Sequence, residues 1–147
     1  MTNHSKHLTE GDNVTPADLK EKWAEALLHH DEMIAGGHKL SPIRFLIRYI
    51  IEKGYDKYCF LGTSLFALLI SIPRDNKVDY TKTLKVDIDE LKNIVKFTYR
   101  NWEGLRRDDK IDFDKSLKWS DTCQLTEACA VFEHFIQTFP EWKAVMK

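Results

Sequence analysis

The sequence predicts a mainly α protein, a single compact domain of about five amphipathic helices. Three observations support this. Apolar residues recur at helical spacing along several segments, capping residues precede those segments, and glycine or proline ends them. We place the helices at 16–35, 42–53, 58–72, 88–103 and 121–138. An α+β arrangement with an antiparallel hairpin at 83–101 is the alternative.

Length and composition predict one folded unit. A chain of 147 residues fits one domain, and its 43% hydrophobic content is enough for a sizeable core. We interpret residues 1–14 as a flexible tail, because this segment is polar and contains Gly11-Asp12-Asn13. Residues 15–147 then form the single globular domain.

The first two helices carry clear boundary signals. Thr15 can cap the first helix, Pro16 suits its first turn, and Gly36-Gly37 ends it. The second begins at Ser41-Pro42 and ends before Gly54. Apolar residues at helical spacing form one stripe along this second helix: Ile43, Leu46, Ile47, Ile50 and Ile51.

The segment 58–72 is nearly continuously apolar, which indicates burial but does not separate a helix from buried strands. The spacing of its leucines suits a helix that Pro73 closes. Gly62-Thr63-Ser64 could instead form a turn or bulge between two strands. We favour the helix.

The segment 88–103 decides the predicted fold class. Asp87 and Glu90 have the spacing of a capping box, and Val86 and Leu91 that of a hydrophobic staple. Against this, β-favouring residues alternate with polar ones along 94–101. A hairpin would leave Leu91 exposed in a turn without glycine. We therefore favour the helix.

Charge and cysteine content exclude several classes of function. The net charge of −1 makes nucleic-acid binding unlikely. The longest uncharged run, between Lys57 and Arg74, is too short to cross a bilayer, so no membrane span is expected. The N-terminus lacks the apolar core of a signal peptide. Three cysteines without a C-x-x-C pair fit a reducing compartment, so we predict a cytoplasmic protein.

No motif for catalysis or cofactor binding is present, so we predict no catalytic residues and no cofactor. The glycines never adopt phosphate-binding spacing, and Gly62-Thr63-Ser64 is not a nucleophile elbow. Glu25 and His29 share a helical face with Glu32, as in helical metal sites. No second helix supplies matching ligands. We therefore predict no metal and keep Glu25 and His29 only as weak candidates.

The charged connector 104–119 supplies the candidate binding residues. It is long for a small domain, and tryptophan and arginine are enriched at protein-binding hot spots. The candidate residues within and beside it are Trp102, Arg106, Arg107 and Trp119. Interleaved aspartates cancel most of the positive field, so a solvated, salt-bridged loop is the competing interpretation.

These observations predict a non-enzymatic protein-interaction module, such as a small adaptor, an inhibitor or a toxin-neutralising, immunity-type protein. Its partner would be another protein, and the sequence leaves its oligomeric state open. The alternative is a small-molecule-binding protein or enzyme with a pocket between helices near His30.

Overall fold

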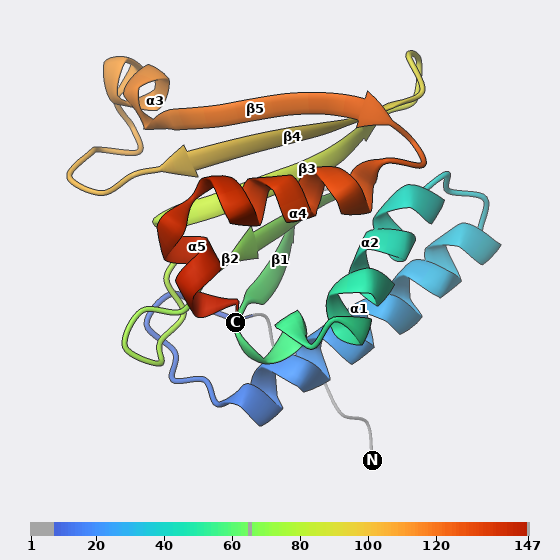
Figure 1. The fold of residues 1–147 in the computed structure, drawn as a ribbon, viewed down its shortest axis with the longest axis horizontal. Helices are drawn as coiled ribbons and strands as arrows, with labels where there is room; N and C mark the ends of the chain where they lie inside the picture. The colour runs from blue at the N-terminus through green and yellow to red at the C-terminus, as the bar shows by residue number, and fades with distance from the viewer. Residues whose placement is uncertain (1–7, 65, 147) are drawn as a thin grey trace.

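The computed structural model describes residues 8–64 and 66–146 and has an α+β architecture (Figure 1). The helices are α1 (Pro16–Ala35), α2 (Ser41–Glu52), the 3-10 turn η1 (Tyr55–Lys57), α3 (Lys110–Ser116), α4 (Ala128–Thr138) and α5 (Pro140–Val145). The strands are β1 (Phe60–Ser64), β2 (Ala67–Ser71), β3 (Lys82–Asp89), β4 (Ile94–Asn101) and β5 (Leu117–Gln124).

The prediction of a mainly α, helical protein is wrong, and the α+β alternative fits. The strands form one antiparallel sheet in the order β1-β2-β3-β4-β5, so each strand pairs with the next along the chain. β3 and β4 pair from Lys82↔Asn101 to Asp89↔Ile94, which is the hairpin of the alternative. Helices precede and follow the sheet in the chain.

One face of the sheet is apolar, because directly paired residues point to the same side. From β2 to β5 this face contains Leu68, Ile70, Leu84, Val86, Val95, Phe97, Tyr99, Trp119 and Cys123. The opposite face over β3, β4 and β5 is polar. It contains Lys85, Asp87, Lys96, Thr98, Ser120 and Thr122.

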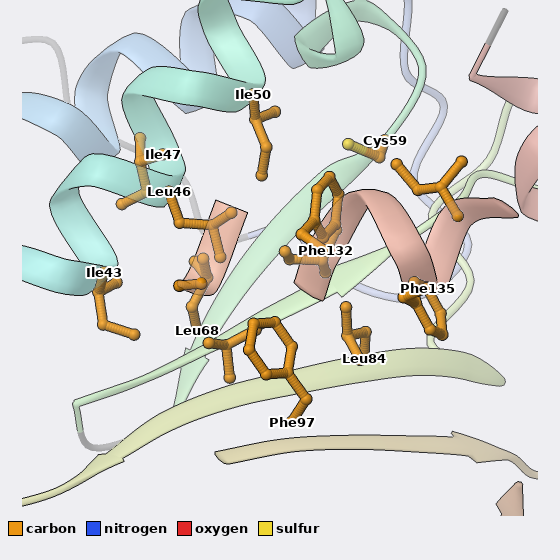
Figure 2. Close-up of a cluster of buried hydrophobic side chains, with 14 of the residues drawn as sticks. Ile43, Leu46, Ile47, Ile50, Cys59, Leu68, Leu84, Phe97, Phe132 and Phe135 are labelled. Atoms are coloured by element: carbon orange, nitrogen blue, oxygen red, sulfur yellow. The ribbon is translucent and has the colours of Figure 1, made fainter. Parts of the chain in front are cut away.

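The main core lies between the apolar face and the helices. α2 contributes the predicted stripe, and α4 contributes Phe132 and Phe135 (Figure 2). Two buried indoles are held by hydrogen bonds: Trp23 Nε1 donates to the Cys59 carbonyl at 2.8 Å, and Trp142 Nε1 donates to the Tyr99 hydroxyl at 3.1 Å. α2 and α4 therefore cover the apolar face of the sheet, and α1 packs against α2.

The predicted helix at 58–72 is wrong. The segment begins at Tyr58, the residue that ends η1, and continues into β1 and β2. These two strands pair from Phe60↔Ser71 to Ser64↔Ala67. β2 pairs on both sides, and four of its five residues are buried. A strand that is buried on both sides needs apolar residues on both faces. It therefore lacks the alternation of apolar and polar residues that would have indicated a strand in the sequence.

The predicted helix at 88–103 is also wrong, because a tight turn replaces the proposed cap. The Asp89 side chain accepts hydrogen bonds from the N–H groups of Leu91 and Lys92, at 3.1 and 3.2 Å. Asn93 adopts a φ of 54°, the left-handed conformation that a glycine often supplies. Leu91 is 97% exposed, as expected for a hairpin; this exposure of an apolar side chain was the reason for favouring the helix.

Of the three other predicted helices, two have nearly the bounds seen in the structure and one does not. α1 has the predicted bounds and α2 is shifted by one residue, with Thr15 forming the capping box of α1 together with Asp18. The helix predicted at 121–138 begins only at Ala128, because residues 117–124 form β5. β5 is an edge strand, so its exposed polar sequence lacks the apolar run that indicates a strand.

The described part of the N-terminal segment packs against the loop before β3. Gly11 donates its N–H to the Val78 carbonyl and Val14 donates to the Asn76 carbonyl, each at 2.9 Å. A second small cluster forms here from Val14, Leu19, Phe60 and Val78. Residues 1–7 of the predicted tail lie outside the described residues.

None of the helices in the described ranges 8–64 and 66–146 combines the length and the apolar character that a bilayer span requires.

Candidate functional site

The connector between β4 and β5 contains a short helix, α3. Asp109 is its N-cap, and the carboxylate accepts hydrogen bonds from the N–H groups of Ile111 and Asp112, at 2.8 and 3.1 Å. The Asp112 carboxylate in turn accepts from the Arg106 N–H at 2.9 Å. Two of the interleaved aspartates therefore order the backbone of the connector rather than only neutralising its charge.

α3 carries an aromatic residue into contact with the end of β4. The Trp102 and Phe113 rings lie 6.1 Å apart between centroids, and the Arg100 guanidinium stacks 3.7 Å above the Phe113 ring. Arg100 Nη1 also donates to the Phe113 carbonyl and to Ser116 Oγ, at 2.7 and 3.0 Å. The arginine thus fixes α3 to the sheet through both stacking and hydrogen bonds.

Arg106 and Arg107 extend from the loop between Trp102 and α3. The Arg106 guanidinium lies 3.8 Å from the Asp108 carboxylate, and both side chains are exposed. Arg107 lies 3.4 Å from the Glu10 carboxylate of the N-terminal segment. These are solvent-screened pairs of small energetic value, so both guanidinium groups remain free to exchange partners.

Trp119 lies apart from the other three predicted binding residues. Its ring packs 5.2 Å from Phe135 of α4 and 6.3 Å from Phe97, under the helices. Trp102 instead contacts Phe113 beside Arg100, and Arg100 points to the opposite face of the sheet from Phe97. Trp102, Arg106 and Arg107 therefore lie in one connector segment, whereas Trp119 packs against the core.

We call the surface formed by Trp102, Arg106, Arg107 and Phe113 the connector surface. Phe113 is 45% exposed although it is the centre of the aromatic contacts, and two other residues of this region, Ile111 and Leu117, are 67% and 44% exposed. Clustered exposed apolar side chains rimmed by charge are typical of sites that bind other proteins. Phe113 was missed from the sequence, although Asp109 and Asp112 before it have the spacing of a helix start.

A network of ion pairs adjoins the connector surface. Lys82 on β3 bonds Glu141 of α5 at 2.6 Å and lies 3.5 Å from Glu103, which Arg74 also contacts at 3.2 Å. Burial alone would lower the pKa of Lys82. The hydrogen bond that Lys82 donates to Glu141 outweighs this effect and raises the pKa. These charges satisfy one another across β3, α5 and two loops, so the network is a structural clamp.

Two shallow hollows flank this network. One is lined by residues around Lys82 and Glu141, and the other runs between Glu10 and Asp79, with Arg74 shared by both. Burial alone would raise the pKa of Asp79, but hydrogen bonds from Thr81 and the charge of Arg74 lower it. The carboxylate therefore stays ionised and is a poor proton donor near neutral pH.

His30, on which the alternative function depends, is buried in α1. Its ring is 2% exposed, and Nδ1 lies 2.9 Å from the Ala26 carbonyl. Burial lowers the pKa of His30. Neither of the two hollows is lined by this residue. The position is that of a core histidine satisfied by its own helix.

The cysteines have the properties of buried thiols. Burial raises the pKa of Cys59 and Cys129, and it raises the pKa of Cys123 to about 11. A nucleophilic cysteine needs the opposite shift, because the thiolate is the reactive form. All three are free thiols that pack as small apolar groups.

The weak metal candidates do not come together with further ligands. Glu25 lies 3.7 Å from Lys22, and the His29 ring lies 6.1 Å from that of His30. Within residues 8–64 and 66–146, no three His, Cys, Asp or Glu side chains are grouped as a metal site would need.

Comparison with known proteins finds no matching family model, no matching curated protein and no matching solved structure.

Proposed function

We propose that the protein is a non-enzymatic interaction module that binds another protein through the connector surface. The observation that carries this proposal is the exposed Phe113, which contacts Trp102 and Arg100 in the same connector as the exposed Arg106 and Arg107. An adaptor, an inhibitor or a toxin-neutralising, immunity-type protein would each use such a surface. The free thiols fit a reducing compartment, and we place the protein in the cytoplasm.

The chemistry of the surface supports a protein partner. Aromatic rings and guanidinium groups dominate binding energy when they are desolvated at the centre of an interface. Here the rings are already fixed by Arg100, so binding would order few additional side chains. Pre-ordering of this kind reduces the entropic cost of association. Arg106 and Arg107 would exchange weak intramolecular pairs for carboxylates of the partner.

Affinity capture from a lysate of the native cell tests the proposal. The bait with Arg106→Ala and Arg107→Ala should capture the partner at least tenfold less than the parent, because two desolvated arginine contacts exceed about 1.4 kcal/mol. Partner amounts are measured by quantitative mass spectrometry. Thermal unfolding of the variant should match the parent, since only screened ion pairs are lost.

A charge-matched control separates this site from general loss of positive charge. Lys20→Ala with Lys39→Ala removes the same charge from exposed positions on α1 and the following loop. We expect this variant to capture the partner as the parent does. Equal capture by the Arg106/Arg107 variant, or an equal loss in the control, would reject the connector surface as the binding site.

A further inference from the structure

The outer edge of the sheet at β5 is open. β5 is the terminal strand of the sheet, and six of its eight residues are exposed. It contains no proline, the residue that most directly blocks strand addition. The other edge, β1, is only five residues long, and its Phe60 is buried beneath the N-terminal segment. β5 is therefore the edge available for pairing with another strand.

The two ends of β5 carry opposite charge. α3 leads directly into Leu117, and this end contains three lysines: Lys110, Lys115 and Lys118. None of the three forms an ion pair within the described part of the chain. Two aspartates lie among them, Asp112, which accepts a hydrogen bond from the Arg106 N–H, and Asp114, so residues 110–118 carry a net charge of +1. This end of the edge is basic and apolar, since Ile111 and Leu117 are exposed.

The other end of β5 is acidic and apolar. Gln124 pairs with Ile94, so the β3–β4 turn lies at this end, as Figure 1 shows. The turn contributes Asp89, Glu90, the exposed Leu91 and one lysine, Lys92, and Glu127 follows β5, so these four charged residues carry a net charge of −2. When two antiparallel β5 strands pair about a twofold axis, the basic end of each copy meets the acidic end of the other.

From this complementarity we propose that β5 is a dimerisation edge, occupied by β5 of a second copy of this chain. The two sheets then join into one continuous antiparallel sheet. The lysines at one end face Glu90 and Glu127 of the other copy, and Ile111 and Leu117 lie near its Leu91. This interface shares the exposed Ile111 and Leu117 with the region of the connector surface but leaves out Arg106 and Arg107. The Arg106/Arg107 variant and the β5 variants therefore test the two proposals separately.

The charge pattern narrows the register. Residues that face each other must share a face, so a residue lies on the axis, and Ser120, Asp121 and Thr122 are the central choices. With Asp121 there, two carboxylates would be adjacent. Ser120 and Thr122 each allow a similar overlap, 118–122 or 120–124, because an irregularity in the pairing at Lys118 ends the regular part of β5. We choose Ser120, which places Lys118 opposite the uncharged Thr122.

Sedimentation velocity over a concentration series tests the dimer. We expect a species of twice the 17.3 kDa chain mass at high concentration. Ser120→Lys should weaken association several-fold, because it places like charges side by side on the axis without touching the core. A monomer at every concentration, or unchanged dimerisation of Ser120→Lys, would overturn the proposal.

A charge exchange between the ends is a sharper test. Lys115→Glu with Lys118→Glu makes both ends acidic, and Glu90→Lys with Glu127→Lys makes both ends basic. Each variant alone should be predominantly monomeric, and their mixture should form a heterodimer. Circular dichroism checks that both variants are folded. If the mixture does not associate when each variant is folded, the proposed pairing is wrong.

Cross-linking tests the register. Directly opposed residues bring Cβ atoms within about 5 Å, near the separation a disulfide needs. Under mild oxidation, Ser120→Cys should form a covalent dimer on a non-reducing gel, above the background of the parent cysteines. Thr122→Cys should not, because it faces position 118. Cross-linking of Thr122→Cys in place of Ser120→Cys would refute the Ser120 axis.

Discussion

His30 is a buried titratable residue whose ionisation the fold opposes. Burial lowers the pKa of His30, and the Ala26 carbonyl only partly offsets this shift. The folded protein therefore keeps the ring neutral, whereas the unfolded chain takes up a proton near the ordinary pKa of 6.5. Stability is thus nearly independent of this residue well above pH 6.5, begins to fall as the pH approaches that value, and falls further below it.

We expect the free energy of unfolding to fall between about pH 7.5 and 5.5, a window in which most carboxylates stay ionised. The decrease for one such histidine is at most about 1.4 kcal/mol per pH unit. His30→Asn should flatten the profile, because its amide can still donate to the Ala26 carbonyl but does not titrate. Urea denaturation at each pH measures the effect, and a profile unchanged by His30→Asn would refute it.

His29→Asn is the matched control. His29 is the exposed neighbour of His30 on the same helix. Its replacement should leave most of the pH dependence of the parent, because His30 stays buried in the variant.

At the scale of the element, the β3–β4 hairpin depends on its turn rather than on its exposed apolar residue. Asp89 binds two backbone N–H groups, and Asn93 supplies the left-handed conformation. Leu91 points into solvent. The turn is therefore determined by two short polar side chains, a kind of hairpin signal that contains no glycine.

Asn93→Ala should lower the free energy of unfolding by about 1 kcal/mol, because the left-handed conformation is sterically less favourable for alanine than for asparagine. Asn93→Gly should not destabilise, since glycine adopts this conformation freely. Urea denaturation of the two variants gives the comparison. Leu91→Ala is the control and should be neutral. Equal destabilisation by Asn93→Gly would show that the Asn93 side chain, not its backbone, stabilises the turn.

At the scale of the whole molecule, one carboxylate joins the helices at the two ends of the chain. Glu133 of α4 accepts hydrogen bonds from the hydroxyls of Tyr49 on α2 and Tyr55 on η1, at 2.7 and 2.6 Å. Burial and this shared carboxylate raise the pKa of Tyr55 to about 12 and that of Tyr49 further. Helices far apart in sequence are thus connected above the sheet.

Glu133→Ala should lower the free energy of unfolding by about 1–3 kcal/mol, because two half-buried hydroxyls lose their acceptor. Glu133→Gln keeps an acceptor oxygen and should lose less. Denaturation followed by tryptophan fluorescence measures both variants. If both Glu133→Ala and Glu133→Gln were as stable as the parent, the hydrogen bonds from Tyr49 and Tyr55 to Glu133 would have no role in joining the helices.

The sequence predicted best where the structure is local. Thr15, Pro16 and the glycines after α1 act within a few residues, so the bounds of α1 and α2 were predictable. In the candidate site, Trp102, Arg106 and Arg107 were found because residue type alone marked them. Phe113 was missed, because its importance comes from contacts with Arg100 and Trp102 that α3 creates.

The strands could not be predicted in the same way. In β2 burial on both faces removed the alternation, and in β5 exposure at the edge removed the apolar run. In β4 a helix-like spacing coincided with true strand alternation. Each of these patterns depends on what lies beside the strand, and the neighbouring strands and the helices packed on the sheet decide that.

The sequence by itself determined the two N-terminal helices, the apolar segments that enter the core, and the tryptophan and arginines of the connector. Only the tertiary structure decided that the central segments pair as a sheet, that Trp119 packs partly buried against α4, and that β5 is left with an open edge. The physical reason is that capping and turn bonds are local, whereas strand pairing and burial are properties of the assembled fold.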